Sequence, residues 1–547
     1  MKKILILSLS LILLSYNGVA QNYDVVVYGS SSAGVIATTK VARMGKKVLL
    51  ISNTNHVGGL TASGLGATDL NKPTHIGGMS REFYKRIYDY YMNPEVWTAQ
   101  TRKDYFDHIG KRIFGGKNEK LGIQWAFEPK VAEKVFNDML HEKNVKVVYG
   151  QRLLLSKSGV VKSGTKILTI IMESGQKYSA KVFIDATYEG DLMAMAGVSY
   201  HMGREANSQY NETYNGIHVS FKEKFDPYLI EGDSKSGLLP FIEPKSPGTN
   251  GQADNRVQAY CYRFPLTTNK NNWLEVKKTL NYNPLWFEHY ARIAEDTDSL
   301  TLKKFITISP LPNKKTDINH CDFIGASYAW AESNYRERDS IAQMHKDYAL
   351  GKIWFLGNDP RIPEKIRQEM KSYGIPKDEF LDTENFPFQL YVREARRMVG
   401  SYVMTENNVN KTITSNRSIG LGTYMLDVHY VSRFVDDKGD LYCEGTFAQN
   451  YGSYPIDYLS ITPKKEDCVN LIVPVCLSSS HAAYGSIRME PVFMSLAEAA
   501  AVAAVFSIDA RSNVQDVSYE HLRSRLLNDG LVLDVPKIQT AKENENE

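Results

Sequence analysis

The sequence predicts an α/β protein: a Rossmann-like nucleotide-binding domain, made of a parallel sheet and a β-meander, that carries a large inserted substrate domain. Three observations predict this fold. A short apolar run is followed at once by a glycine turn and a helical stretch, a second glycine-rich segment comes next, and an alanine-rich helix lies near the C-terminus. Strand, glycine turn and helix in this order open a dinucleotide-binding fold.

The opening unit lies directly after the first twenty residues. Residues 24–28 form a predicted buried strand, residues 29–34 the turn, residues 35–44 a helix that ends at Gly45, and residues 48–51 a second strand. The free N–H groups at the start of such a helix can bind a pyrophosphate. We therefore expect a nucleotide at this turn.

The turn reads Gly-Ser-Ser-Ser-Ala-Gly and departs from the usual three-glycine fingerprint. Gly29 makes the tight turn and Gly34 allows close packing of helix on strand, but Ser31 stands where the second glycine is expected. No acidic residue follows the second strand, and Ser52 and Asn53 there can hydrogen-bond a ribose instead. The predicted cofactor-binding residues of this unit are Gly29, Ser31, Ala33, Gly34 and Ser52.

Residues 56–66 form a second glycine-rich loop that includes Gly58 and Gly59. Glycines let a backbone approach a bulky ligand closely. The flavin end of FAD extends beyond the pyrophosphate and needs such a surface, so this loop favours FAD over NAD. Gly58 and Gly59 join the predicted cofactor-binding residues.

Middle segments add to the predicted FAD/NAD(P)-binding domain. We expect a helix at 130–140 and a strand at 145–149. Two more strands, near 153–155 and 167–172, are expected to form the β-meander because both runs are apolar and lie close together in sequence.

The last pieces of the domain are far apart in sequence. A predicted strand at 182–187 contains Asp185, which we expect to contact the cofactor. The fold resumes near 472–475, and an alanine-rich helix follows at 491–508, with Val492 in its first turn. The positive end of a helix can stabilise an anionic reduced flavin, so Val492 is also a predicted cofactor contact.

The N-terminus has the order of a secretory signal. Lys2 and Lys3 precede an apolar run at 4–14, and small residues end at Ala20. Charge, apolar core and small-residue cleavage site predict a Sec-type signal peptide and hence a periplasmic or secreted protein. No later segment is expected to span a membrane.

We predict five parts along the chain. They are a signal peptide (1–20), the first part of the FAD-binding domain (21–200), a substrate or cap domain (201–450), the second part of the FAD-binding domain (451–510), and a C-terminal helix with a polar tail (511–547).

Many ordered segments of the chain resemble the FAD-dependent oxidoreductase family, in particular a secreted bacterial branch labelled "xanthan lyase-like". These segments are residues 29–34, 56–69, 125–129, 185–191, 203–210, 315–319, 390–397 and 480–494. The resemblance implies bound FAD and redox chemistry, not a particular substrate. A weaker likeness to succinate dehydrogenase and fumarate reductase flavoproteins implies that Arg488, just before the late helix, contacts substrate.

Two histidines and an arginine are the predicted catalytic residues. His481 is the first choice as base, because it lies seven residues before Arg488 on the approach to the late helix and histidine titrates near neutral pH. Arg488 is expected to hold an anionic substrate or the flavin C2=O. His429, with Asp427 on the same face of a strand, is the second choice of acid/base pair.

Structural roles stay open for these side chains. His481 can equally be a histidine bonded within its serine-rich turn, and Arg488 can form a salt bridge to Glu490 or Glu498. Arg393 and Arg397 would share one face if residues 391–397 were helical. That face could bind a carboxylate or sulfate, or it could belong to an internal ion network.

Composition limits the partners. The 65 basic and 62 acidic residues leave a net charge of +3, with no dense basic run, so nucleic acid is not expected as a partner. The five cysteines show neither a CxxC pair nor a zinc spacing, so no metal is expected, and an odd number leaves at least one thiol outside any intrachain disulfide.

The predicted activity is oxidation of a small polar organic molecule, such as a carbohydrate or derivative, by hydride transfer to flavin N5. There is one nucleotide motif and none for NAD(P)H, haem or an iron–sulfur cluster, so the electron acceptor is unknown: oxygen, a quinone or a partner protein. Two alternatives remain: a non-redox FAD-dependent isomerase or hydratase, and a catalytically inactive binding protein.

Overall fold

A central sheet of seven strands organises the computed structural model, which describes residues 21–70, 72–109, 116–295 and 300–536. Its parallel part has the order β5 (Lys146–Val148), β2 (Val48–Ile51), β1 (Gln21–Tyr28) and β8 (Lys177–Asp185), and β21 (Leu471–Ile472) also pairs with β8. The predicted parallel sheet is confirmed. The predicted signal peptide and the end of the polar tail lie outside the described residues.

The β-meander extends this sheet on its other side. Strand β7 (Lys166–Ile171) runs antiparallel to β8, and β6 (Val160–Ser163) runs antiparallel to β7. The strand predicted near 153–155 is wrong, because Leu153 makes only an isolated bridge to Met172. The tight turn at Gly164, where φ is +57°, instead selects β6 as the partner of β7.

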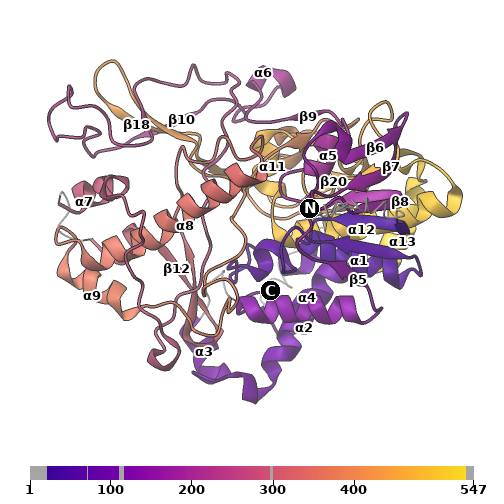
Figure 1. Ribbon diagram of the computed structural model, residues 1–547, viewed down its shortest axis with the longest axis horizontal. Helices are drawn as coiled ribbons and strands as arrows, with labels where there is room; N and C mark the ends of the chain where they lie inside the picture. The colour runs from indigo at the N-terminus through magenta and orange to yellow at the C-terminus, as the bar shows by residue number, and fades with distance from the viewer. Residues whose placement is uncertain (1–20, 71, 110–115, 296–299, 537–547) are drawn as a thin grey trace, which may run out of the picture.

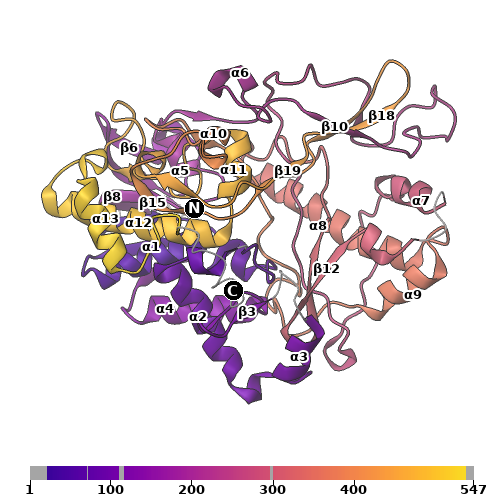
Figure 2. The same ribbon diagram turned by 180° about the vertical axis from the view of Figure 1, so that it is seen from behind.

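Helices from both ends of the chain cover the sheet. Helix α1 (Ser32–Arg43) packs on α12 (Glu490–Ala510), and α2 (Gly78–Met92) and α4 (Pro129–His141) lie beside them. The indigo and yellow ribbons of α1 and α12 adjoin in both views (Figures 1 and 2). The predicted helices at 35–44, 130–140 and 491–508 are confirmed.

Among the described residues, α12 is the one helix long and apolar enough to cross a membrane, by length and composition alone. Its apolar stretch is 89% buried inside the protein. Small alanines let it pack closely against α1, so α12 is a core helix.

A second lobe lies beside the sheet domain (Figure 1). It contains α7 (Glu288–Glu295), the long α8 (Tyr335–Asn358) and α9 (Glu364–Ser372), with a hairpin of β12 (Thr307–Leu311) and β13 (Lys315–Asn319). A four-stranded sheet has the order β10 (Val219–Lys222), β18 (Leu441–Glu444), β17 (Ser432–Val435) and β11 (Ile242–Glu243).

The remaining helices and strands are short. They are α3 (Arg102–Ile109), α5 (Asp191–Met195), α6 (Asn207–Tyr210), α10 (Glu406–Val409), α11 (His481–Ile487), α13 (Tyr519–Asn528), β3 (Lys117–Asn118), β4 (Ile123–Gln124), β9 (Tyr200–His201), β14 (Arg397–Met398), β15 (Ser418–Gly422), β16 (Leu426–Val428), β19 (Phe447–Gln449) and β20 (Tyr454–Asp457). The domain limits proposed from the sequence at 200, 450 and 510 stay predictions.

Residues 391–397 are not helical, so the condition under which Arg393 and Arg397 would share one helix face is not met. Arg397 begins β14, which pairs antiparallel with β9, and Arg393 precedes it in irregular backbone. Both arginines are buried, and acids from other segments neutralise them: Glu205 lies 2.9 Å from Arg397, and Asp322 lies 2.8 Å from Arg393. Buried charges require such partners, so tertiary ion pairing overrides the local helical spacing, and the internal network is the arrangement observed.

All five cysteines are buried and unpaired. The expectation of at least one free thiol is therefore confirmed.

Candidate active site

The glycine turn after β1 forms one wall of a pocket. Gly29 has φ +100°, and a Cβ added to it would lie 2.7 Å from the backbone of Ala186 and Thr187. The Ser31 hydroxyl donates to Ala186 O at 2.6 Å and accepts from Gly34 N at 3.3 Å. Ser31 thereby caps α1, so this helix begins at the pocket wall with its positive end facing it.

The pocket is narrow, with a cavity volume of about 10 Å³. It is lined by Gly29, Ser30, Ser31, Asn53, Thr54, Gly59, Ala186, Thr187, Tyr188, Glu189, Phe388 and Gln389. Of the predicted cofactor-binding residues, Gly29, Ser31 and Gly59 thus line it. The others do not: Ala33, Gly34, Ser52, Gly58, Asp185 and Val492.

Two of these predicted contacts support the pocket from behind. Ser52 is fully buried, and its hydroxyl bonds Ser30 Oγ at 2.7 Å, so Asn53 and Thr54 line the pocket in its place. Asp185 accepts hydrogen bonds from the backbone N–H and hydroxyl of Thr187, which holds that pocket residue in position. Burial raises the pKa of Asp185 to about 6.

Three distant segments meet at Glu490, the first residue of α12. Its carboxylate accepts hydrogen bonds from Ser32 of the first glycine turn at 2.5 Å, from Thr61 of the second glycine loop at 2.8 Å, and from Tyr188 at 2.8 Å. Burial raises the pKa of Glu490. From the sequence, Glu490 was considered only as a salt-bridge partner for Arg488. The available signal was its position next to Pro491, at the start of an apolar helix that was expected to be buried.

These residues fit the adenosine diphosphate half of FAD. A helix N-terminus suits a pyrophosphate, the close-packed glycine turn leaves no room for a side chain, and the polar groups of Asn53 and Thr54 suit a ribose. The model for the family described as FAD dependent oxidoreductase matches residues 24–526.

The chain belongs to this family. Its members bind FAD, so the protein is a flavoprotein and an FAD-linked redox enzyme. The predicted family, Rossmann-like fold and cofactor are confirmed; the "xanthan lyase-like" branch and the succinate dehydrogenase likeness stay predictions. A comparison with curated proteins finds no match.

Solved flavoproteins show only remote similarity to this one. L-proline dehydrogenase from P. horikoshii is 16% identical over 34% of this chain and 59% of its own, with a TM-score of 0.24. Glycine oxidase from Geobacillus kaustophilus is 11% identical over 33% of this chain and 59% of its own (TM-score 0.23). L-amino acid deaminase from Proteus vulgaris is 13% identical over 37% of this chain and 55% of its own (TM-score 0.23). The similarity therefore spans less than two thirds of each solved chain.

A cluster of charged and phenolic side chains surrounds Arg488, at the end of α11. The guanidinium donates to Tyr391 Oη at 2.5 Å and to the backbone carbonyl of Asp427 at 2.8 Å. Its Nε is buried and has no hydrogen-bond partner among the described residues. The alternative ion pair with Glu490 or Glu498 does not form, because hydroxyls hold Glu490 and Lys40 holds Glu498.

His429 follows β16 in the same cluster. Its Nδ1 lies 2.6 Å from Asp322 Oδ2, and its Nε2 lies 3.6 Å from Asp427 Oδ2. Burial alone would raise the pKa of Asp322, but Arg393 and His429 hold it well below its ordinary value. Asp322 therefore stays ionised and fixes the imidazole.

Sequence reasoning missed Asp322, Tyr391 and Tyr424. The Tyr424 hydroxyl lies 3.4 Å from Asp69, which follows the second glycine loop. This bond connects the cluster to the segment that follows the second glycine loop. Asp69 and Tyr391 both lie inside segments that resemble the family, and this resemblance was the sequence signal that could have identified them as site residues.

His481 lies apart from this cluster at the start of α11. Its side chain is 1% exposed, Nδ1 lies 2.8 Å from Glu394 Oε2, and Nε2 is buried with no partner among the described residues. Seven residues of helix separate it from Arg488 by about 10 Å along the axis. The predicted base is therefore enclosed in the ion network, whereas His429 is 13% exposed.

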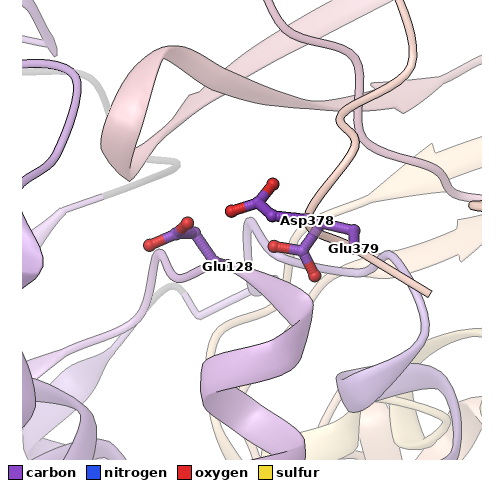
Figure 3. Close-up of side chains that lie close together, drawn as sticks. All are labelled: Glu128, Asp378 and Glu379. Carbon is purple, nitrogen blue, oxygen red and sulfur yellow. The ribbon is translucent and has the colours of Figure 1, made fainter. Parts of the chain in front are cut away.

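Among the described residues, one acidic trio lies close enough to hold a metal ion: Glu128, Asp378 and Glu379 (Figure 3). Lys315 already pairs with all three carboxylates, and Lys130 pairs with Glu128 and Asp378. The Lys315 ammonium lies 2.8 Å from both Glu128 and Asp378 and 2.5 Å from Glu379. The trio thus anchors the β12–β13 hairpin to the N-terminus of α4.

Proposed function

We propose that the protein oxidises a polar organic substrate, such as a carbohydrate or derivative, by removing hydride from a carbon that bears a hydroxyl group. FAD supplies the hydride acceptor, flavin N5. The observation that carries the proposal is the contact of His429 with Asp322 at 2.6 Å, in the cluster that Tyr424 links to the second glycine loop.

His429 takes the hydroxyl proton in this scheme. Asp322 accepts from Nδ1–H, which leaves Nε2 as the proton acceptor. The distance of 3.6 Å from Nε2 to Asp427 is too long for a hydrogen bond, so Nε2 remains available. Arg488, with its free Nε, binds a substrate oxygen or carboxylate.

Anaerobic mixing tests the proposal. The purified full-length protein is mixed without oxygen with a panel of sugars, polyols and hydroxy acids, and flavin absorbance is followed. Lasting bleaching by one class supports oxidation. Turnover of a substrate without lasting bleaching would instead identify a non-redox isomerase or hydratase. Purified protein that shows no flavin spectrum even after addition of FAD would identify an inactive binding protein.

The oxidised substrate leaves two electrons to be passed on. We propose oxygen, a quinone or a partner protein as acceptor, so the enzyme is an oxidase or a dehydrogenase. Rapid reoxidation of bleached protein by air, with hydrogen peroxide formed, supports the oxidase; slow reoxidation in air with fast reoxidation by a soluble quinone supports the dehydrogenase.

We further propose that the protein is exported to the periplasm or secreted. The order of charge, apolar core and small residues at positions 1–20 supports this. Mass spectrometry of protein recovered outside the cytoplasm is expected to find a mature N-terminus at Gln21; an intact Met1 in the cytoplasm would contradict it.

A further inference from the structure

The segment that follows α9 of the second lobe contributes to the nucleotide pocket. Phe388 and Gln389 line it together with the glycine turn after β1, more than 300 residues earlier in the chain. The backbone N–H of Gln389 donates to Ser63 Oγ at 2.9 Å. This bond ties the segment 382–389 to the second glycine loop.

His56 fixes the position of the Phe388 ring. The two rings are stacked, with centroids 4.1 Å apart and planes 6° from parallel. His56 Nδ1 lies 3.0 Å from Glu133 of α4, and Nε2 lies 3.4 Å from Asp382. His56 therefore spans α4 and the segment that carries Phe388.

Protonation of His56 strengthens this arrangement. Burial acts to lower its pKa, but the hydrogen bond and charge of Glu133 outweigh burial and raise the pKa. A protonated imidazole attracts both carboxylates, Glu133 from one side and Asp382 from the other. The ring that supports Phe388 is thus held from both sides.

We propose that Phe388 and Gln389 form the closing wall for the adenosine diphosphate half of FAD, and that His56 is the positioning residue that holds Phe388 in place. The other lining residues belong to the glycine turn, the segment after β2, the second glycine loop and the turn after β8. An aromatic ring offers a flat apolar surface on which a base can stack, and loss of such a ring weakens binding about 10-fold or more. Cofactor affinity then depends on the second lobe.

The inference predicts selective weakening of adenosine-bearing ligands. Full-length Phe388→Ala, freed of flavin, is titrated with FAD, with ADP and with riboflavin, which lacks the adenosine diphosphate half. The Kd for FAD and for ADP is expected to rise about 10-fold or more, while the Kd for riboflavin stays within about twofold. Leu381→Ala is the matched control, because Leu381 lies seven residues before Phe388, is exposed to solvent and does not line the pocket.

Two outcomes overturn the inference. Unchanged ADP and FAD affinity in Phe388→Ala would show that the ring does not contact that half. Equal weakening of FAD and riboflavin, or equal weakening in Leu381→Ala, would show a general loosening of the fold. The thermal unfolding curves of both variants identify a folding defect, and in that case Phe388→Leu, which keeps most of the buried volume, is titrated instead with the same expected selectivity.

Two substitutions of His56 test whether its ring positions Phe388. His56→Ala is expected to raise the Kd for ADP about 3- to 10-fold, and His56→Phe, which retains a flat ring, is expected to restore it to within about twofold of the parent protein. If His56→Phe binds ADP as weakly as His56→Ala, ring stacking does not position Phe388, and the role assigned to His56 is wrong.

Discussion

The Nδ1 atom of His429 lies 2.6 Å from Asp322 Oδ2, although the two residues are 107 positions apart in the sequence. Arg393 lies on the other oxygen of the same carboxylate at 2.8 Å. An ionised aspartate that accepts from Nδ1–H selects the tautomer with a free Nε2, which is the form a general base requires.

Replacing His429 with glutamine is expected to slow flavin reduction by a bleaching substrate about 10²- to 10⁴-fold, the usual contribution of a general base. The FAD content should not change, because His429 does not line the nucleotide pocket. Anaerobic stopped-flow absorbance measures the rate. Asp322→Asn should cause a smaller loss and shift the pH profile of the rate; a parent-like rate in His429→Gln would remove His429 from the mechanism.

Gly29→Ala is expected to abolish FAD binding. The added Cβ would lie 2.7 Å from backbone atoms of the neighbouring turn, and φ at +100° adds strain of about 1–3 kcal/mol. The FAD-to-protein absorbance ratio measures the effect. Gly45→Ala is the matched control: Gly45 also has positive φ, but nothing lies within 4 Å of its Cβ position. It should lose stability yet retain FAD.

Glu490→Ala is expected to destabilise the protein and reduce its FAD content. The substitution leaves the hydroxyls of Ser32, Thr61 and Tyr188 without their buried acceptor, at about 1–3 kcal/mol for each that finds no other partner. Glu490→Gln keeps one acceptor oxygen and should lose less. Thermal unfolding and the amount of bound FAD are measured for both variants. A Glu490→Ala variant as stable as Glu490→Gln would contradict the expected role of the Glu490 carboxylate.

Glu212 predicts a pH-dependent stability difference. Its carboxylate accepts from Ser480 Oγ at 2.6 Å, beside His481, and burial raises its pKa from 4.5 to about 7. A raised pKa gives stability that is full below pH 4.5 and is lost as the pH rises through 7. Glu212→Gln does not ionise, so its Tm relative to the parent should increase between pH 5 and pH 8.

The size of this effect is bounded. The shift of the Glu212 pKa corresponds to at most about 3 kcal/mol at high pH. Parallel melting curves of parent and variant at pH 5, 6, 7 and 8 measure it. A Tm difference that does not change with pH would show that Glu212 ionises at its ordinary pKa.

Local sequence patterns predicted the sheet domain because its signals are short-range. The apolar run before Gly29 specifies β1, and the Ser31 cap with the following alanines and valines specifies α1. The alanine-rich composition of residues 491–508 likewise favours the helical conformation of α12, whichever part of the protein it packs against. Each of these elements is decided by neighbours within a few residues.

Only the tertiary structure decided the conformation of 391–397, the enclosure of His481 and the meeting of His429 with Asp322. Each depends on a buried charge whose partner lies far away in sequence, and the cost of burying an unpaired charge outweighs local preference. The sequence by itself thus determined the cofactor and the fold that binds it, whereas the choice of base and the wall at Phe388 depended on which distant side chains the folded chain brought together.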